Sequence, residues 1–369
     1  MKVLFTHPYF WPYVRRGAER ELHDAGVRLV RSGHEVRLLT STPTGVHQQA
    51  DIDGLKVRYV RTPLSPVGRH KGWDETSAFA RPAFAALQLV KPDLVHAWHY
   101  PDGAAAVRAS RGRFPVVLKL TGTVIPERIL RRPVDGLLIK RAVEGADEVW
   151  CNSEFARSEM ADFGVAMRIV PAGVDASVFH PAGNRSSEPT AFVASASDEP
   201  RKRLVDVVDG WPEVVALLPT ATLRIAGHAS AATRAELLDR IPETARASIH
   251  FLGLLDDVAL VDEFSTAWCV LAPAVYEALG LVTIEAWACG TPVLGARSGA
   301  TAELITHPGL GALVEPLDPQ SWTEAMVTAM QSPPPPALEA CVDASRPFHW
   351  ERIMPVYEER YAALLGERR

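Results

Sequence analysis

Short apolar runs of strand length alternate with amphipathic stretches of helical length along the chain. Residues 2–6, 116–120, 191–196 and 267–273 are runs of the first kind. Residues 17–32 carry apolar side chains at the spacing of one helical face. Strands and helices in alternation build βαβ units with parallel strands. The pattern therefore predicts an α/β protein.

The most informative unit spans residues 267–296. Its apolar run from Ala267 to Pro273 predicts a buried parallel strand. An apolar stretch of helical length follows and stops at Gly290, a residue type suited to the left-handed position after a helix. Residues 292–296 predict the next strand. Because ligands of open α/β sheets bind where strands end and helices begin, the loop before this helix is the expected ligand site.

The chemistry of that loop suits a sugar nucleotide. The amides of Gly280, Leu281 and Val282 lie at the predicted helix start, where free N–H groups and the helix dipole favour a phosphate. Glu277 and Glu285 stand on either side. Ionised carboxylates hold neutral diols through charge-assisted hydrogen bonds. One carboxylate on each side of a phosphate site fits a diphosphate with a sugar at both ends, and two surface carboxylates beside a tight turn are the alternative.

Composition sets the broad class. The chain has 369 residues, more than one core comfortably holds, which predicts two domains. Its net charge of −5 argues against nucleic acid as a partner. The cysteines are far apart, and Cys269 and Cys289 lie in apolar runs, so buried thiols in a reducing compartment are expected. No apolar run approaches the ~20 residues that cross a bilayer. We expect a cytoplasmic protein whose membrane contact is absent or peripheral.

Two pairs of residues invite a metal assignment. Asp51 and Asp53 form an Asp-x-Asp pattern, but they precede Gly54 and a predicted strand, so turn residues are the better interpretation. His96 and His99 lie near a strand end, and nothing near them in the sequence supplies further ligands. We expect no metal and no cofactor. His99 is a candidate for contact with a substrate, and a hydrogen-bonded structural histidine is the alternative.

Glu277-x7-Glu285, followed by Ala-Trp-Ala-Cys-Gly-Thr-Pro-Val, resembles the signature of the retaining glycosyltransferases of family 4. The resemblance implies the GT-B fold, in which two Rossmann-like domains face each other across a cleft. It implies that Glu277 binds hydroxyls of the donor sugar and Glu285 the ribose of the nucleotide. The amides of Gly280 to Val282 would hold the distal phosphate.

The resemblance extends over nearly the whole chain and implies its division. Gly33-His-Glu-Val and Asp93-Leu-Val-His look like strands of the family's N-terminal half. Residues 1–183 would form the acceptor-binding domain, with a C-terminal helix at about 350–369 packing back on it. Residues 190–349 would bind the nucleotide sugar, after a linker that is polar by composition.

Three positions depart from the family pattern. Arg16-Gly17 replaces a pair of glycines near the donor phosphate, so either Arg16 adds a cation there or the loop lies farther back. We favour the first. Thr121 replaces a histidine that contacts the donor sugar, and its hydroxyl could still donate a hydrogen bond. Ser197 replaces an arginine that grips the diphosphate.

Nearby cations can stand in for the missing arginine. Lys202 aligns with the family's phosphate-binding lysine, and Arg201 or Arg203 could substitute at the second position. A solvated helix start is the alternative for Lys202. Glu127 opens a basic segment and is, with His99, a candidate acceptor contact. In membrane-tethered relatives such a segment touches anionic lipid or an anionic acceptor, and a solvated helix face is the alternative.

The resemblance implies a retaining glycosyltransferase that moves a sugar from a nucleotide-diphosphate sugar to a hydroxyl of a small soluble metabolite or glycan precursor. Lys202 and the loop amides would stabilise charge on the leaving phosphate, and Glu277 and Thr121 would contact the donor sugar. Two rivals stay open. One is a sugar-nucleotide epimerase or hydrolase on the same fold, and the other is a non-catalytic sugar-nucleotide-binding protein.

Overall fold

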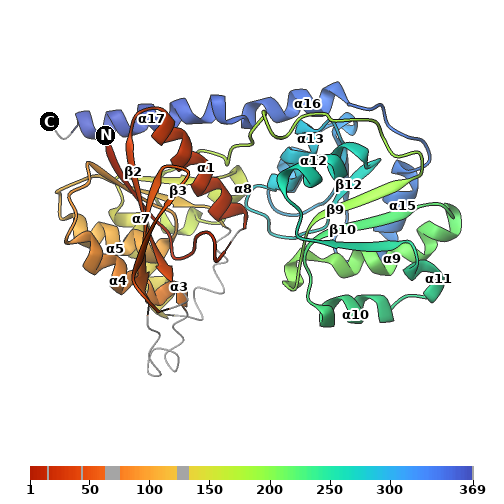
Figure 1. Ribbon diagram of the computed structural model, residues 1–369, viewed down its shortest axis with the longest axis horizontal. Coiled ribbons are helices and arrows are strands. Elements are labelled where there is room, and N and C mark those ends of the chain that lie inside the picture. Colours follow the sequence, from red (N-terminus) through yellow and green to blue (C-terminus); the bar gives the residue numbers. More distant parts are fainter. Residues whose placement is uncertain (15, 43–44, 63–74, 123–132, 368–369) are drawn as a thin grey trace. The chain divides into compact units, whose positions relative to one another are not determined.

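The computed structural model describes residues 1–14, 16–42, 45–62, 75–122 and 133–367. Contacts divide the chain into two compact units, each described here by itself (Figure 1). The first unit comprises Met1–Gly173 and Glu351–Arg369, and the second comprises Val174–Trp350. The chain therefore returns to its first unit after completing the second.

The first unit is built on an eight-stranded sheet with the order β3-β4-β2-β1-β5-β6-β7-β8. Only β3 runs antiparallel to its neighbour. The strands are β1 (Lys2–Thr6), β2 (Glu35–Thr42), β3 (Gln48–Ile52), β4 (Leu55–Arg61), β5 (Leu94–Ala97), β6 (Val116–Leu120), β7 (Glu148–Cys151) and β8 (Met167–Ile169). The predicted parallel α/β architecture is confirmed in this unit.

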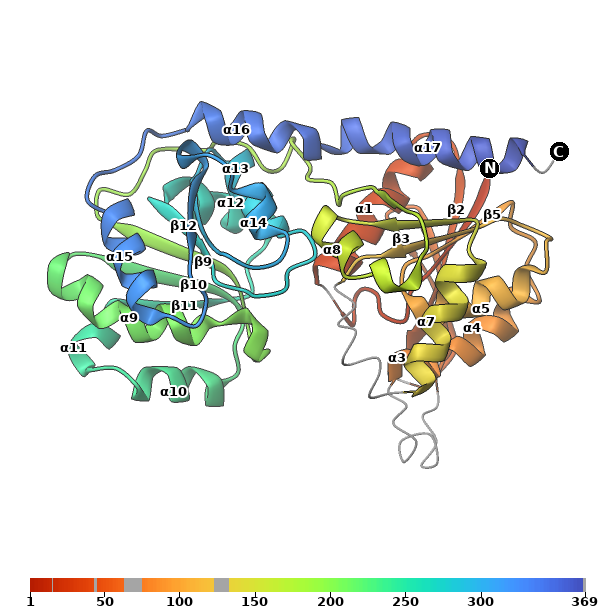
Figure 2. The same ribbon diagram turned by 180° about the vertical axis from the view of Figure 1, so that it is seen from behind.

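Helices cover both faces of this sheet. The helical elements are α1 (Gly17–Arg31), α3 (Glu75–Ala78), α4 (Ala80–Leu87), α5 (Tyr100–Ser110), α7 (Pro133–Gly145), α8 (Glu154–Ser158), η1 (Ala161–Phe163) and α17 (Trp350–Gly366). α4, α5 and α7 pack on one face, and α1 and α17 lie over the other (Figures 1 and 2). α1 approaches β4 closely at Gly26, where a Cβ would stand only 2.7 Å from a methyl group of Leu55. The absence of a side chain at this position allows the approach.

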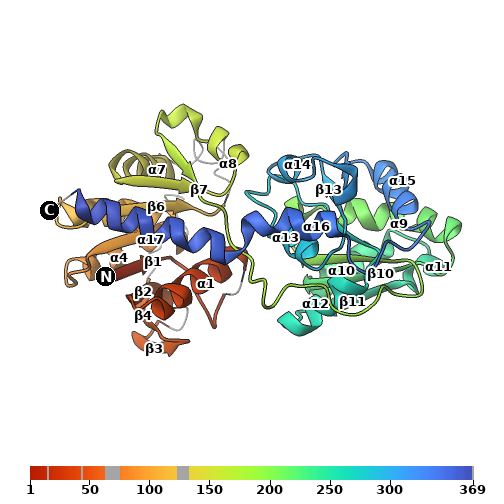
Figure 3. The same ribbon diagram turned by 90° about the horizontal axis from the view of Figure 1, so that it is seen from above.

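Buried polar contacts join α17 to the first sheet. Tyr357 accepts a hydrogen bond of 3.0 Å from Lys119 in β6, and the Tyr361 hydroxyl lies 2.5 Å from Nδ1 of His96 in β5. Lys119 forms a salt bridge with Glu21 of α1, and both side chains are buried. The helix crosses several strands of this sheet (Figure 3). α17 is therefore held by specific partners as well as by apolar contact.

The second unit contains a six-stranded parallel sheet in the order β11-β10-β9-β12-β13-β14. Its strands are β9 (Thr190–Ser197), β10 (Thr222–His228), β11 (Ile249–Gly253), β12 (Cys269–Ala272), β13 (Val293–Ala296) and β14 (Gly311–Val314). Its helical elements are η2 (Pro200–Lys202), α9 (Leu204–Leu217), α10 (Ala231–Asp239), α11 (Glu243–Arg246), α12 (Asp257–Thr266), α13 (Leu281–Ala288), α14 (Thr301–Leu304), η3 (Pro308–Leu310), α15 (Pro319–Ala329), α16 (Glu339–Ser345) and η4 (Arg346–Phe348). Large buried side chains such as Trp211 and Trp322 fill the core between α9, α15 and the sheet.

One local expectation needs correction. Asp51 lies inside β3, an edge strand whose polar sequence lacks the alternation that predicts strands, and only Asp53 occupies the turn, at φ 53°. All four cysteines are free and buried. Within the described ranges, no helix has the length and apolarity that crossing a bilayer requires.

Candidate functional site

The sheet topology of the second unit marks where a ligand should bind. β9 is the first strand, β10 and β11 follow on one side, and β12 continues on the other. The order therefore reverses between β9 and β12, and ligands of such sheets bind beyond the carboxyl ends of the strands at this point. Lys202 follows β9 and Glu277 follows β12, so both lie at that position.

The structure brings three predicted site residues into direct contact here. Nζ of Lys202 lies 2.7 Å from Oε1 of Glu277, and Nη1 of Arg201 lies 3.1 Å from the same oxygen. Arg201 also donates to Glu199 at 2.8 Å. Lys202 and Arg201 are separated from Glu277 by more than 70 positions in the sequence. Two cations and one carboxylate thus share the switch point.

The neighbouring cations keep Glu277 ionised. Its side chain is 22% exposed, and burial by itself would raise its pKa. The charges of Lys202 and Arg201, together with their hydrogen bonds, outweigh burial and lower the pKa of Glu277 below its ordinary value. A carboxylate at this position is an acceptor only, which suits the hydroxyl groups of a sugar.

The loop of residues 298–300 holds the backbone of Glu277 in place through hydrogen bonds and a close backbone contact. The Ala300 amide donates to the Glu277 carbonyl at 2.9 Å, and the Tyr276 amide donates to Oγ of Ser298 at 3.2 Å. Gly299 has φ 62°, and a Cβ there would stand 2.7 Å from O and 2.8 Å from N of Glu277. Only glycine fits this approach without displacing the backbone of the loop.

The start of α13 presents the predicted amides. Gly280, at φ 85°, is the residue before the helix, and Leu281 and Val282 are its first two positions. Amides at these positions have no acceptor within the helix, and the helix dipole adds positive potential. Glu285 lies farther along α13 and is only 7% exposed. Its burial shows that the second predicted carboxylate is not simply a solvated surface group.

Arg201 and Arg203, the two candidates to replace the missing arginine, have different partners in the structure. Arg203 has φ 49° and donates from Nε to Asp206 at 3.0 Å, so its guanidinium belongs to the start of α9. Arg201 is the cation that reaches Glu277. Ser197 is the last residue of β9. Of the two suggested substitutes, Arg201 is the one that lies beside Glu277 at the switch point.

The first unit has its own switch point, between β1 and β5. His7 follows β1 and His99 follows β5, and their ring centroids lie 6.1 Å apart. The sequence pointed to His99 and missed His7, although its position directly after the first strand of an α/β unit was a signal. His7 is buried, which lowers its pKa despite the nearby charge of Glu19.

Gly17, Arg16 and Thr121, which were also predicted in the first unit, lie at the same sheet edge. Gly17 begins α1, and Arg16 precedes it with a side chain bound to Glu19 at 3.0 Å. The Arg16 charge is thus already shared with a carboxylate. Thr121 follows β6, and its carbonyl accepts from Asn152 at 3.2 Å. Glu127 lies outside the described residues.

Two Rossmann-like units in one chain, each built on a mainly parallel sheet, are the architecture of the GT-B fold. Residues 15–178 match the family model described as Glycosyltransferase Family 4, and residues 188–332 match the one described as Glycosyl transferases group 1. The chain belongs to this family of glycosyltransferases. In the part of the chain that the structure describes, no three His, Cys, Asp or Glu side chains are grouped as metal ligands.

Curated relatives and solved structures cover almost the full chain. A D-inositol 3-phosphate glycosyltransferase from Mycolicibacterium vanbaalenii is 26% identical, with 93% of this chain and 84% of the relative covered. A glycogen synthase from Mycobacterium tuberculosis is 25% identical, with 100% and 96% covered.

Among solved structures, the sucrose-phosphate synthase of Thermosynechococcus elongatus aligns with TM-score 0.82 at 20% identity, covering 99% of both chains. The Anabaena protein HepE in complex with UDP-glucose aligns with TM-score 0.77 at 20% identity, covering 98% of this chain and 100% of its own. These likenesses establish the GT-B fold.

Proposed function

We propose that this glycosyltransferase moves a sugar from a nucleotide-diphosphate sugar to a hydroxyl group of a small soluble acceptor, with retention of configuration. The observation that carries the proposal is the contact of Lys202 and Arg201 with Glu277 at the switch point of the second sheet. Cations for a diphosphate and an acceptor for sugar hydroxyls are the two groups that such a donor needs side by side. HepE, with a similar fold, is solved with UDP-glucose.

In the proposed complex, the second unit holds the donor. Lys202, Arg201 and the amides of residues 280–282 bind the diphosphate, and Glu277 accepts hydrogen bonds from the transferred sugar. Glu285 accepts from the ribose. When a donor enters, its phosphates replace the Glu277 carboxylate as partners of the two cations. The carboxylate then becomes available to hydroxyl groups without changing its ionised state.

The proposed reaction breaks the bond between the anomeric carbon and the leaving phosphate oxygen. The acceptor hydroxyl attacks the anomeric carbon from the same face, and its proton passes to the departing oxygen. Lys202 and the helix-start amides stabilise the charge that grows on that phosphate. Thr121, Gly17 and Arg16 are assigned to contacts with the donor, and His99 and Glu127 to contacts with the acceptor. No enzymic nucleophile is required.

Calorimetry with a panel of sugar nucleotides, followed by acceptor-dependent release of nucleotide, tests the proposal. We expect one donor to bind and its nucleotide to be released only when acceptor is added. Turnover without any acceptor would instead favour the epimerase or hydrolase, and binding without turnover would favour the non-catalytic protein. Screening polyhydroxylated acceptors against the identified donor then narrows the second substrate.

A Glu277→Gln variant tests the assignment of the donor contact. Loss of a charged acceptor for sugar hydroxyls should lower turnover roughly 100-fold, because hydrogen bonds to charged groups contribute about 1.5–3 kcal/mol each. Affinity for the nucleotide diphosphate should stay the same or rise, because Lys202 is released from its partner. Glu213→Gln, on exposed α9 surface, is the matched control. Full turnover in the Glu277 variant would remove the basis of the proposal.

A further inference from the structure

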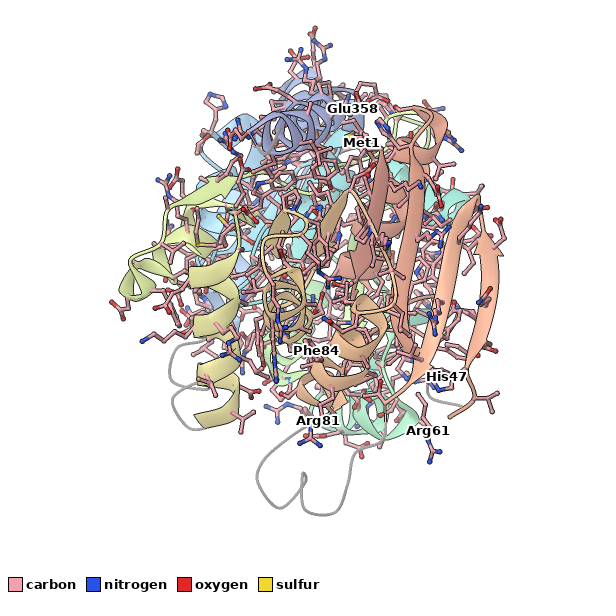
Figure 4. The ribbon with its side chains drawn as sticks, turned by 90° about the vertical axis from the view of Figure 1, so that its left-hand side faces the viewer. Met1, His47, Arg61, Arg81, Phe84 and Glu358 are labelled. Atoms are coloured by element: carbon pink, nitrogen blue, oxygen red, sulfur yellow. The ribbon has the colours of Figure 1, made fainter. Side chains whose placement is uncertain are left out.

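A hollow of about 500 Å³ lies on the first sheet, on the face that α4 borders. β2, β4 and β3 form its floor, and α4 closes one side. Figure 4 shows this side of the unit, with Phe84 and Arg81 on α4 and Arg61 at the end of β4. The volume lies in the range of roughly 300–1,000 Å³ that is typical of small-molecule sites. No residue assigned to sugar transfer lines it.

The strand register divides the lining into an apolar and a cationic end. Leu4 pairs with Arg37, which pairs with Lys56, and Thr6 pairs with Leu39, which pairs with Arg58. The apolar members therefore lie toward β1, where Ala86 and Val90 join them from the side of α4. Lys56 and Arg58 lie on β4, and Arg37 lies on β2 between Leu4 and Lys56. One hollow thus offers both an apolar and a positively charged end.

The charges at the cationic end are only partly compensated. Arg37 pairs with Glu35 at 2.6 Å, and Oδ1 of Asp51 accepts a hydrogen bond of 2.9 Å from the Gly54 amide. Neither Lys56 nor Arg58 forms an ion pair with any described residue, although Glu35 acts on Lys56 electrostatically. Asp51 also lines the hollow and stands opposite Lys56 in the register of β3 and β4, so Lys56 and Arg58 outnumber one carboxylate and this end keeps a positive charge that can attract an anion from solution.

We propose that this hollow binds a single amphiphilic anion. Its phosphate or carboxylate contacts Arg58 and Lys56, and its hydrocarbon part lies along Leu39 and Val90, extended by the aliphatic stems of the two cations. A flat bilayer surface fits a hollow poorly. Residues 63–74 of the chain are a poor occupant of the hollow. Arg69 and Lys71 outnumber Asp74, so this segment carries a net positive charge, as the cationic end of the hollow does. The site is independent of the proposed sugar transfer.

Titration calorimetry with dodecyl phosphate below its micelle concentration tests the inference. We expect binding with one molecule per chain, and much weaker binding of dodecanol, which lacks the charge, and of inorganic phosphate, which lacks the chain. The double variant K56Q/R58Q should bind dodecyl phosphate at least about tenfold more weakly, because two charge-assisted contacts are lost. The K140Q/R141Q control, on exposed positions of α7, should bind as the parent does.

The apolar end is tested by a second matched pair. Val90→Asp places a charge in the lining and should weaken dodecyl phosphate binding about tenfold, whereas Leu89→Asp, at an exposed position outside the lining, should not. If each control variant lost as much affinity for dodecyl phosphate as its test variant, or if several molecules bound per chain, the binding would be non-specific and the proposal would be overturned. Binding to phosphatidylglycerol vesicles without binding of the monomer would assign the face to a membrane and would also overturn it.

Discussion

At the scale of single residues, the ionisation of Glu277 depends on its two cations. Burial would raise the pKa of Glu277, and Lys202 and Arg201 lower it below the ordinary value. Because the pKa is lowered in the folded state, this contribution to stability is present above the unfolded pKa and is lost as the pH falls through the folded one. At neutral pH the carboxylate is therefore charged and paired.

Lys202→Met should shift the pH dependence of transfer. Without the ammonium group, only Arg201 opposes the effect of burial and the pKa of Glu277 rises, so the acid limb of the pH–rate profile should move to higher pH. Turnover at the optimum should fall on the order of 100-fold, because charge on the leaving phosphate loses a partner. Lys202→Arg, which keeps a cation, is the control and should restore the position of the acid limb. If the acid limb of the pH–rate profile did not move in Lys202→Met, ionisation of Glu277 would not control the rate of transfer.

Gly299→Ala should damage the site without unfolding the unit. The new Cβ would approach O and N of Glu277 to 2.7 and 2.8 Å at a positive φ, so the Glu277 loop must shift. We expect kcat to fall roughly tenfold or more from a displacement of the order of 1 Å. Gly253→Ala, also at positive φ but with no atom within 4 Å of the place its new Cβ would take, controls for backbone strain alone. Similar kcat values for the two variants would contradict a positioning role.

The sequence predicted most residues of this candidate site, but it did not predict their contacts. Glu277, Glu285 and Lys202 followed from motifs, because each motif is local in the chain. The contact of Arg201 with Glu277 depends on β9 lying beside β12, a pairing of strands more than 70 residues apart. His7 carries no motif, so only the strand order, with β1 beside β5, brings it to His99.

At the scale of elements, α17 is held to the first sheet through a buried ion pair. Lys119 and Glu21 form a salt bridge, and Lys119 also donates to Tyr357 of α17. Burial raises the pKa of Glu21 and lowers the pKa of Lys119, and each partner opposes the shift of the other. Such a pair is costly to break from one side, because the remaining charge stays buried.

Lys119→Met should therefore destabilise the first unit by about 3–5 kcal/mol. Hydrogen exchange of peptides from β5 and β6, followed by mass spectrometry, measures the loss within this unit. The double variant K119M/E21Q should recover most of it, because no unpaired charge remains. Lys140→Met, at an exposed position of α7, is the control. A double variant as unstable as the single one would show that apolar packing, not the charge, was lost.

Element predictions succeeded where the hydrophobic pattern was strong. Residues 350–365 repeat at helical period, and the structure has α17 from Trp350 to Gly366. β3 was missed because Gln-Gln-Ala-Asp-Ile has no apolar alternation, and its pairing with β4 comes from the tight turn at Asp53 and Gly54. Lys119 lies in an otherwise apolar strand, and its partners in α1 and α17 could not be inferred from local sequence.

At the scale of the whole molecule, each unit has a core of its own. One cluster of buried residues gathers around Trp211, Trp268 and Trp322 in the second unit, and another lies between β1, β5, β6 and the helices α4, α5 and α7 in the first. Separate cores allow the units to unfold separately, and a ligand stabilises only the unit that it binds. The proposed division of labour therefore has a thermodynamic signature.

Calorimetric melting with the identified donor should reveal that signature. A donor at 100 times its Kd contributes about 2.7 kcal/mol, which corresponds to roughly 5–11 °C for a unit of this size. We expect the transition of the second unit, which holds the diphosphate and the ribose, to move by this amount, and the transition of the first unit, which supplies fewer donor contacts, to move less. Lys119→Met assigns the transitions, because it lowers the melting temperature of the first unit only. A donor that raised the first transition alone would place the diphosphate near Gly17 and Arg16 and would leave the cations beside Glu277 without a role in binding it.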